Sequence, residues 1–184
     1  GDSGTSAHVF SDEACGAYKL LTSNHSSVKE IAVMGNAVAL GSKSPIFEAR
    51  VSITGTPHAD DIIIIGLVDE RHDTVDSISH AAIFRMEGAN QNILIETDDD
   101  TTNNDDLDTG SDWVSTTYYK FKIDMSDLAD VKFFIDGVRQ LSTTSLNMAE
   151  AKNTLFRPIV EVQCSSGEIA QANVDYISVL WKRS

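Results

Sequence analysis

Apolar and polar residues alternate along much of this chain, with the period of two that is typical of half-buried β-strands. The alternation runs from Ile46 to Ile53, returns from Thr117 to Asp124 and returns again from Val131 to Ile135. The pair Asp136-Gly137 then supplies the residues that a tight hairpin turn prefers. These stretches predict antiparallel strands that are joined by turns.

Further strands are expected where short apolar stretches end at turn residues. Ile62 to Val68 is a continuous apolar run with one glycine, which predicts a central strand covered on both faces. Helical signals are confined to one turn at Ser126 to Ala129 and two turns at Ser145 to Lys152. Strands are expected at Tyr18 to Leu21, Val28 to Met34, Ala37 to Leu40, Ala81 to Met86, Asn92 to Thr97, Pro158 to Cys164 and Val174 to Trp181. The pattern therefore predicts an all-β sandwich or barrel.

The length favours one domain. A chain of 184 residues can bury most of its apolar surface in a single core. Residues 1–12 are small and polar, which predicts a flexible N-terminal arm. We expect residues 13–184 to form one sandwich domain.

The charge balance excludes some classes of partner. The formal net charge is −14, and a phosphate backbone would be repelled by such a surface. No apolar run approaches the roughly 20 residues that a membrane-spanning helix needs. We therefore expect neither a nucleic-acid partner nor a membrane span.

The two cysteines, Cys15 and Cys164, have neither zinc-ligand nor redox spacing. Two buried thiols that behave as small apolar side chains are favoured over a disulfide. A bridge, the alternative, would tie an early segment to a late one, as suits a sandwich whose terminal strands are neighbours.

Three groups of segments together resemble one fold family. They are Pro45 to Val51 with Ile64 to Val68, Tyr118 to Asp124 with Phe133 to Gly137, and Val174 to Val179. In this order they are similar to the concanavalin A-like jelly roll, an antiparallel β-sandwich shared by legume lectins, laminin-G-type modules and many glucanases. The resemblance covers about Pro45 to Trp181 and implies this fold, although a fold does not determine function.

Glucanase activity in that family would need paired carboxylates in the order Glu-x-Asp-x-x-Glu, about 5 Å apart and facing one cleft. The nearest match, Glu96-Thr97-Asp98-Asp99-Asp100, lacks the second glutamate. Glu96, Asp98 and Asp100 point the same way only if the strand continues into the expected loop. A solvated acidic turn is the preferred interpretation, so we predict that the protein is not an enzyme.

An acidic segment, residues 98–110, holds six aspartates and two asparagines. A flexible, self-repelling surface loop is the preferred interpretation. Calcium binding is the alternative, because Ca²⁺ takes several oxygen ligands, although the order does not match an EF-hand. The ligands would be Asp98, Asp100, Asp105, Asp106 and Asp108.

Aromatic and amide side chains near this segment suggest a sugar-binding surface. Trp113 lies beside the acidic segment, and its ring can stack on a sugar. Tyr118 and Asn92 are the other candidates for such a surface. Trp181 ends the last expected strand and is interpreted as a core or interface residue.

The resemblance extends to accessory head and tail components of tailed phages. It implies a virion structural protein, a capsid decoration or cement subunit on the exterior of a phage head, with the major capsid or another virion protein as partner. Such a subunit is expected to be a homo-oligomer, with a trimer favoured. The alternative is a lectin-like carbohydrate-binding module with a glycan partner, and a glycoside hydrolase ranks third.

Overall fold

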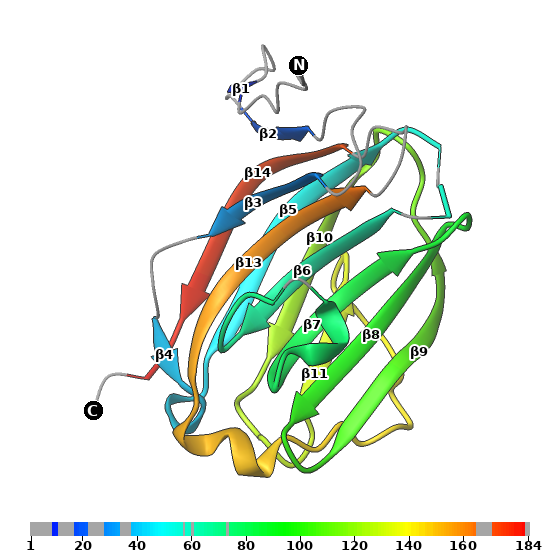
Figure 1. Cartoon of the computed structure of the whole chain (residues 1–184). Coiled ribbons are helices and arrows are strands. Elements are labelled where there is room, and N and C mark those ends of the chain that lie inside the picture. The colour runs from blue at the N-terminus through cyan, green and yellow to red at the C-terminus, as the bar shows by residue number, and fades with distance from the viewer. Residues whose placement is uncertain are drawn as a thin grey trace.

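Two antiparallel β-sheets, named sheet A and sheet B, pack face to face in the computed structural model (Figure 1). The structure describes residues 9–10, 17–21, 28–33, 38–56, 58–59, 61–72, 74–164 and 171–182. Sheet B is the nearer layer in Figure 1 and sheet A lies behind it. The predicted antiparallel jelly-roll sandwich is confirmed.

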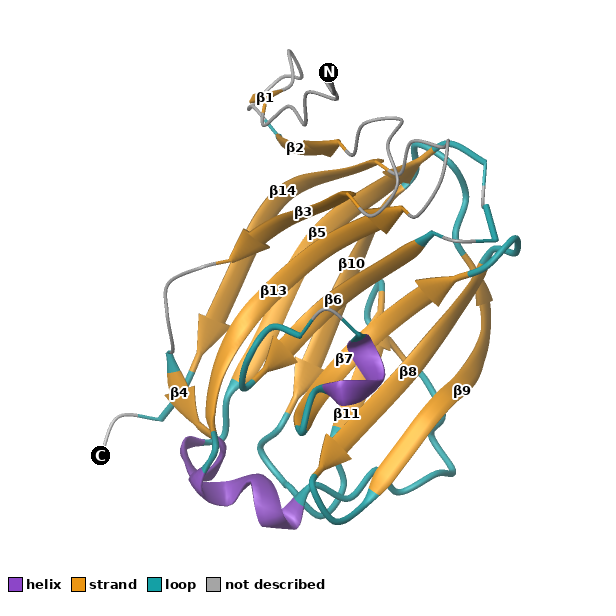
Figure 2. Ribbon diagram, viewed as in Figure 1, coloured by secondary structure: helices purple, strands orange, loops and turns teal. Residues whose placement is uncertain are grey.

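The strands of each sheet come from distant parts of the chain. Sheet A has the order β1 (Val9–Phe10), β2 (Tyr18–Leu21), β14 (Gln171–Leu180), β5 (Ile46–Thr54), β10 (Tyr118–Asp124), β11 (Lys132–Ile135) and β12 (Val138–Arg139). Sheet B has the order β3 (Val28–Val33), β13 (Leu155–Cys164), β6 (Ile62–Val68), β7 (His80–Glu87), β8 (Asn92–Asp99) and β9 (Asn103–Asp112), while β4 (Ala39–Leu40) pairs with β13. The 3₁₀ helices are η1 (Gly41–Lys43), η2 (Val75–Ser77) and η3 (Ala149–Asn153), and Figure 2 shows η2 in front of β7.

The core lies between the two sheets. Phe84 of sheet B packs against Phe121 and Phe133 of sheet A, with ring centroids 4.9 and 5.1 Å apart. All three rings are fully buried, so they anchor one sheet on the other. Gly66 lies where the backbone of the neighbouring strand β7 comes close, because a Cβ there would come within 2.3 Å of the Ala82 carbonyl oxygen, and within 2.9 Å of Ile123 Cδ1 from sheet A.

The acidic segment differs from its prediction as a loop. Most of it forms β9, an edge strand that pairs with β8 in a hairpin. Its carboxylates are mostly exposed and alternate with half-buried positions. Charged side chains suit an edge strand because they prevent a further strand from pairing there. The aspartates therefore mark the border of sheet B.

The flexible N-terminal arm stays a prediction, and the predicted helical turns need a small correction. Residues 9–10, within the predicted flexible arm, form β1 and pair with β2; residues 1–8 and 11–12 lie outside the described residues. The predicted helical turns at residues 145–152 shift to η3, and residues 126–129 form turns.

Cys164 is buried, as predicted, while Cys15 lies outside the described residues. No helix among those described is long and apolar enough to cross a bilayer.

Candidate functional site on sheet B

The outer face of sheet B, turned away from sheet A, carries an arginine in the middle of an apolar strand. In β7 the side chains of Ala82, Phe84 and Met86 point into the core between the sheets. Because side chains alternate along a strand, Arg85 lies on the opposite face. The Arg85 side chain is only 7% exposed, so its charge must be balanced locally.

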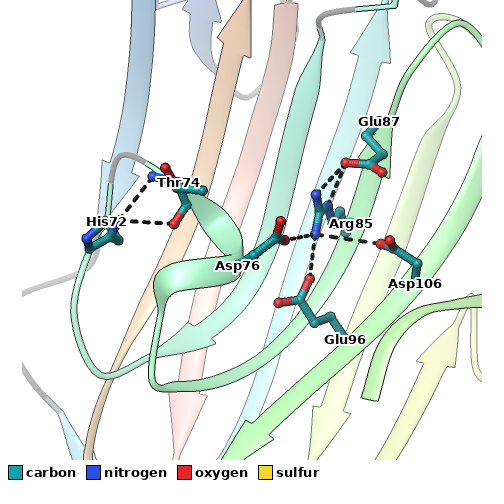
Figure 3. A network of polar contacts seen from close by, with 7 residues as sticks. All are labelled: His72, Thr74, Asp76, Arg85, Glu87, Glu96 and Asp106. Atoms are coloured by element: carbon teal, nitrogen blue, oxygen red, sulfur yellow. Dashed lines mark hydrogen bonds and ion pairs between the residues drawn. The ribbon is translucent and has the colours of Figure 1, made fainter. Parts of the chain in front are cut away.

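Four carboxylates surround the Arg85 guanidinium (Figure 3). Glu96 on the neighbouring strand β8 accepts a hydrogen bond from Nη1 at 2.9 Å, and Glu87 accepts one from Nε at 2.8 Å. Asp76 of η2 bonds Nη1 as well, and Asp106 of β9 lies 3.6 Å from it. We call these five residues the Arg85 cluster. It joins three adjacent strands to the segment that covers them.

Burial changes the proton affinity of the cluster. Glu96 is 2% exposed, and this desolvation raises the pKa of its carboxyl to about 7. The hydrogen bond from Arg85 lowers that pKa, but burial outweighs it, and the charges of Asp76 and Asp105 add to the rise. Burial opposes the charged form of Arg85, yet bonds to Asp76 and Glu96 raise its pKa overall. Glu96 can therefore gain or lose a proton near neutral pH while Arg85 stays charged.

The segment between β6 and β7 covers part of this face. Val75 and Ile78 are buried on Ile64, Ile83 and Ile159, which form a second apolar cluster outside the main core. Polar contacts hold the same segment at both ends. His80 Nδ1 lies 2.9 Å from Asp69, and Arg71 lies 3.5 Å from Glu161 of β13. His72 Nδ1 accepts the Thr74 N–H at 3.1 Å in the turn before η2 (Figure 3).

Beside the covered part, the outer face has an open groove of about 420 Å³. Ile62 and Leu94 supply apolar surface, and both side chains are half-buried. The full lining is Ala59, Asp61, Ile62, Glu87, Gly88, Asn90, Leu94 and Gln163. Glu87 belongs to both the groove and the Arg85 cluster, so the two features form one continuous site.

Two amides give the groove its hydrogen-bonding groups. The Asn90 side-chain oxygen accepts the Asn92 N–H at 2.9 Å, which leaves its NH₂ group as a donor. Gln163 Oε1 is buried and has no hydrogen-bond partner among the described residues. A buried carbonyl oxygen normally has a partner, so this oxygen has an unused capacity to accept a hydrogen bond.

The five predicted calcium ligands are not brought together as a metal site. Asp98 and Asp108 accept backbone N–H groups of Asp100 and Gly110, at 2.7 Å each, and Asp106 contacts Arg85. Within the described part of the chain, no three carboxylate, imidazole or thiol groups are arranged to hold a metal ion. Calcium binding through Asp98, Asp100, Asp105, Asp106 and Asp108 stays a prediction.

The predicted sugar-binding residues lie apart. Trp113 is 4% exposed and belongs to the core, so it is not a ring on an open surface as the sequence suggested. Tyr118 belongs to sheet A, where Arg50 stacks on its ring at 4.2 Å, whereas Asn92 begins β8 of sheet B. Trp181, expected in the core or an interface, is 43% exposed. The groove is built from other residues.

One part of the site was within reach of the sequence. Strand β8 continues to Asp99, so Glu96 and Asp98 do share a face, and Glu96 is a buried residue rather than part of a solvated turn. Arg85 was missed, although a charge inside the apolar stretch of residues 81–86 is a signal for a buried ion pair. Its partners Asp76 and Glu87 had no sequence signal of their own.

Comparison with known proteins places the chain by its fold. No family model matches the sequence, and no curated protein matches it. A family 7 alginate lyase, A1-II', is similar in structure with a TM-score of 0.67 and 13% identity, covering 97% of this chain and 86% of the lyase. A carbohydrate esterase from the Shiga toxin-encoding bacteriophage phi24B has a TM-score of 0.59 and 15% identity over 99% and 89% of the two chains.

A lectin domain has the same fold. The carbohydrate recognition domain of Emp46p is similar with a TM-score of 0.61 and 10% identity, covering 92% of this chain and 84% of that domain. At such identities the likeness shows the fold alone, and the predicted concanavalin A-like jelly roll is confirmed. These three structural neighbours are carbohydrate-active proteins or lectins.

These neighbours correct the prediction that the protein is not an enzyme. That prediction rested on the missing glutamate of a glucanase motif, but the neighbours with this fold include lyases and an esterase. The absence of one motif is therefore no ground for excluding catalysis. None of these neighbours is described as a capsid protein, so the virion location, the capsid partner and the trimer stay predictions.

Proposed function

We propose that the protein is carbohydrate-active and that it binds a glycan in the groove on the outer face of sheet B. The observation that carries this proposal is the groove itself, about 420 Å³ with apolar and amide groups, beside a buried ion cluster. A volume of this size lies within the usual range for small-molecule sites. The fold neighbours that act on or bind carbohydrates support the same class of ligand.

The lining matches the two kinds of surface on a sugar ring. The C–H face of a pyranose would lie on Ile62 and Leu94. Its hydroxyl groups would bond to the amides of Asn90 and Gln163 and to the Glu87 carboxylate. Sites of this kind combine an apolar floor with a few polar groups that fix the orientation of the ligand.

The Arg85 cluster gives the groove a rigid wall and a nearby proton. Glu87 is held by Arg85, so its position in the groove is fixed before a ligand arrives. Glu96 bonds the same guanidinium as Glu87, and burial raises the pKa of its carboxyl to about 7. A carboxyl with such a pKa suits general acid or base catalysis. Its charge would act on the groove through Arg85, which bonds both Glu96 and the lining residue Glu87.

A glycan array followed by calorimetry on each hit tests the proposal. We expect Gln163→Ala and Asn90→Ala each to weaken binding about 10-fold, as the loss of one hydrogen bond to a ligand predicts. Asn153→Ala is the matched control, because Asn153 is an exposed amide on η3 outside the groove. Each hit is also incubated with the protein and analysed for cleavage products. An array without hits, or equal losses in all three variants, would refute the proposal.

A further inference from the structure

We infer that the groove selects glycans without carboxylate or sulfate groups, and that an amino group on the sugar strengthens binding. This inference rests on the proposed function and names the ligand class for the same site. It separates this protein from its structural neighbours that are alginate lyases, because alginate is a chain of uronic acids.

The charged side chains in the described lining of the groove are negative. Asp61 and Glu87 line it, and no lysine or arginine stands among the described residues of the lining. A sugar carboxylate in the groove would therefore face the like charges of Asp61 and Glu87. Repulsion of this kind is a recognised way to reject a wrong ligand.

Arg85, the arginine that holds the lining residue Glu87, is already neutralised by its own carboxylates. Arg85 already contacts Asp76, Glu87, Glu96 and Asp106, and its side chain is 7% exposed. One guanidinium and four carboxylates leave the Arg85 cluster with a net charge of −3, or −2 when Glu96 is protonated. A uronate would have to displace one of these carboxylates to reach the arginine.

The hydrogen-bonding groups point to the same ligand class. Among the described side chains of the lining, Gln163 Oε1 and the Glu87 and Asp61 carboxylates are acceptors, and the amide NH₂ groups are the donors. Sugar hydroxyl and ammonium groups are donors that match them, whereas carboxylate and sulfate groups can only accept. The surrounding field has the same sign, because β9 borders this sheet with Asp105, Asp106, Asp108 and Asp112 and the whole chain carries −14.

The test compares matched ligands. Each neutral hit from the array is measured by calorimetry beside its C6-carboxylate derivative and its amino derivative, at about 20 and about 500 mM NaCl, with EDTA present so that no cation bridges the charges. We expect the carboxylate form to bind at least about 10-fold more weakly than the neutral one at low salt. We expect the amino form to bind more tightly at low salt, with the difference shrinking at high salt as charges are screened.

Two variants locate the effect. Glu87→Gln and Asp61→Asn each remove one negative charge from the lining, and either should reduce the preference for the neutral over the carboxylate form several-fold while the neutral ligand still binds. Lys120→Gln on the exposed surface of sheet A is the charge-changing control and should leave the preference unaltered. If Asp61→Asn does not fold, Glu87→Gln alone tests the inference.

The outcomes separate the two proposals. Carboxylate forms that bind as tightly as the neutral ones would overturn the charge inference and leave glycan binding intact. An array on which neutral, amino and anionic glycans all fail to bind would overturn the proposed function and this inference with it. A preference that Glu87→Gln and Asp61→Asn both leave unchanged would show that the groove charges do not cause it.

Discussion

Arg85 and Glu96 form an ion pair between adjacent strands, with 2.9 Å between Nη1 and the carboxylate, on the outer face of a sheet and away from the main core. Both side chains are nearly inaccessible to solvent. Glu96 cannot reach another cation from this position within the described structure, while Arg85 has three further carboxylates. The arginine is therefore the centre of the arrangement, and the following predictions start from it.

Loss of Arg85 should destabilise the fold strongly. In Arg85→Ala the buried Glu96 and its neighbours lose their counter-ion, and removing one partner of a buried pair typically costs about 3–5 kcal/mol. Arg50→Ala is the control, because its pair with Asp175 is 42% and 31% exposed and should contribute far less. Urea denaturation of both variants measures the difference. Similar losses in the two would contradict the central role of Arg85.

Stability should fall as the pH rises from about 4.5 to about 7, through the titration of Glu96. Burial raises the pKa of this carboxyl from 4.5 to about 7, so the folded state holds a proton that the unfolded state has lost across this window. By linkage, stability then decreases with rising pH, and about 1.4 kcal/mol per pKa unit puts the total on the order of 3 kcal/mol.

Glu96→Gln separates this effect from the general repulsion of an acidic chain. The variant keeps the shape of the side chain and removes its titration. Its free energy of unfolding should depend less on pH than that of the wild type between pH 4.5 and about 7, and the two curves should run parallel above about pH 8. Curves that are parallel throughout would show that Glu96 has an ordinary pKa.

Most strands were predictable because one face of each is buried, which makes apolar and polar residues alternate along the sequence. Strand β5 matches its predicted range within one residue, and β6 was recognised from its unbroken apolar run as a central strand. The run is unbroken because the main core covers one face of β6, and the segment that carries Val75 and Ile78 covers the other. Strand β9 escaped because its aspartates resemble a loop, and an edge position is known only once the sheet order is known.

The site was less predictable because it depends on which strands pair and in which register. Glu96 was singled out for a carboxylate motif, but its contact with Arg85 follows from the register of β7 against β8. Asp76 reaches the same arginine only because Val75 and Ile78 fix the covering segment on the sheet. Trp113 was predicted on the surface because it lies beside the acidic segment in the sequence. The fold instead buries its ring in the core.

The two tryptophans should differ in fluorescence. Trp113 is 4% exposed and Trp181 is 43% exposed. In Trp181→Phe the remaining emission should be blue-shifted and poorly quenched by acrylamide, whereas in Trp113→Phe it should be red-shifted and readily quenched. Both variants in urea serve as the control, because the two rings are then equally accessible. Efficient quenching of Trp113 in the folded protein would contradict its place in the core.

Gly66 should tolerate no side chain. A Cβ at this position would meet the Ala82 carbonyl oxygen at 2.3 Å and Ile83 Cα at 2.8 Å, and neither is the end of a flexible side chain. Strand β6 lies between β13 and β7, so it can move away only by breaking pairing on one side. Overpacking usually costs about 1–3 kcal/mol, and a clash with backbone puts Gly66→Ala at about 3 kcal/mol or more.

The control for this last change is Gly110→Ala. Gly110 has no atom within 4 Å of the added Cβ, but its φ of +71° is unfavourable for alanine. The cost there should be about 1–2 kcal/mol, from backbone conformation alone. Thermal and urea denaturation of both variants compare steric clash with backbone strain. A Gly66→Ala variant as stable as Gly110→Ala would mean that β6 and β7 can move apart at this point without loss, and the close approach of the β7 backbone would then not be what requires glycine in this strand.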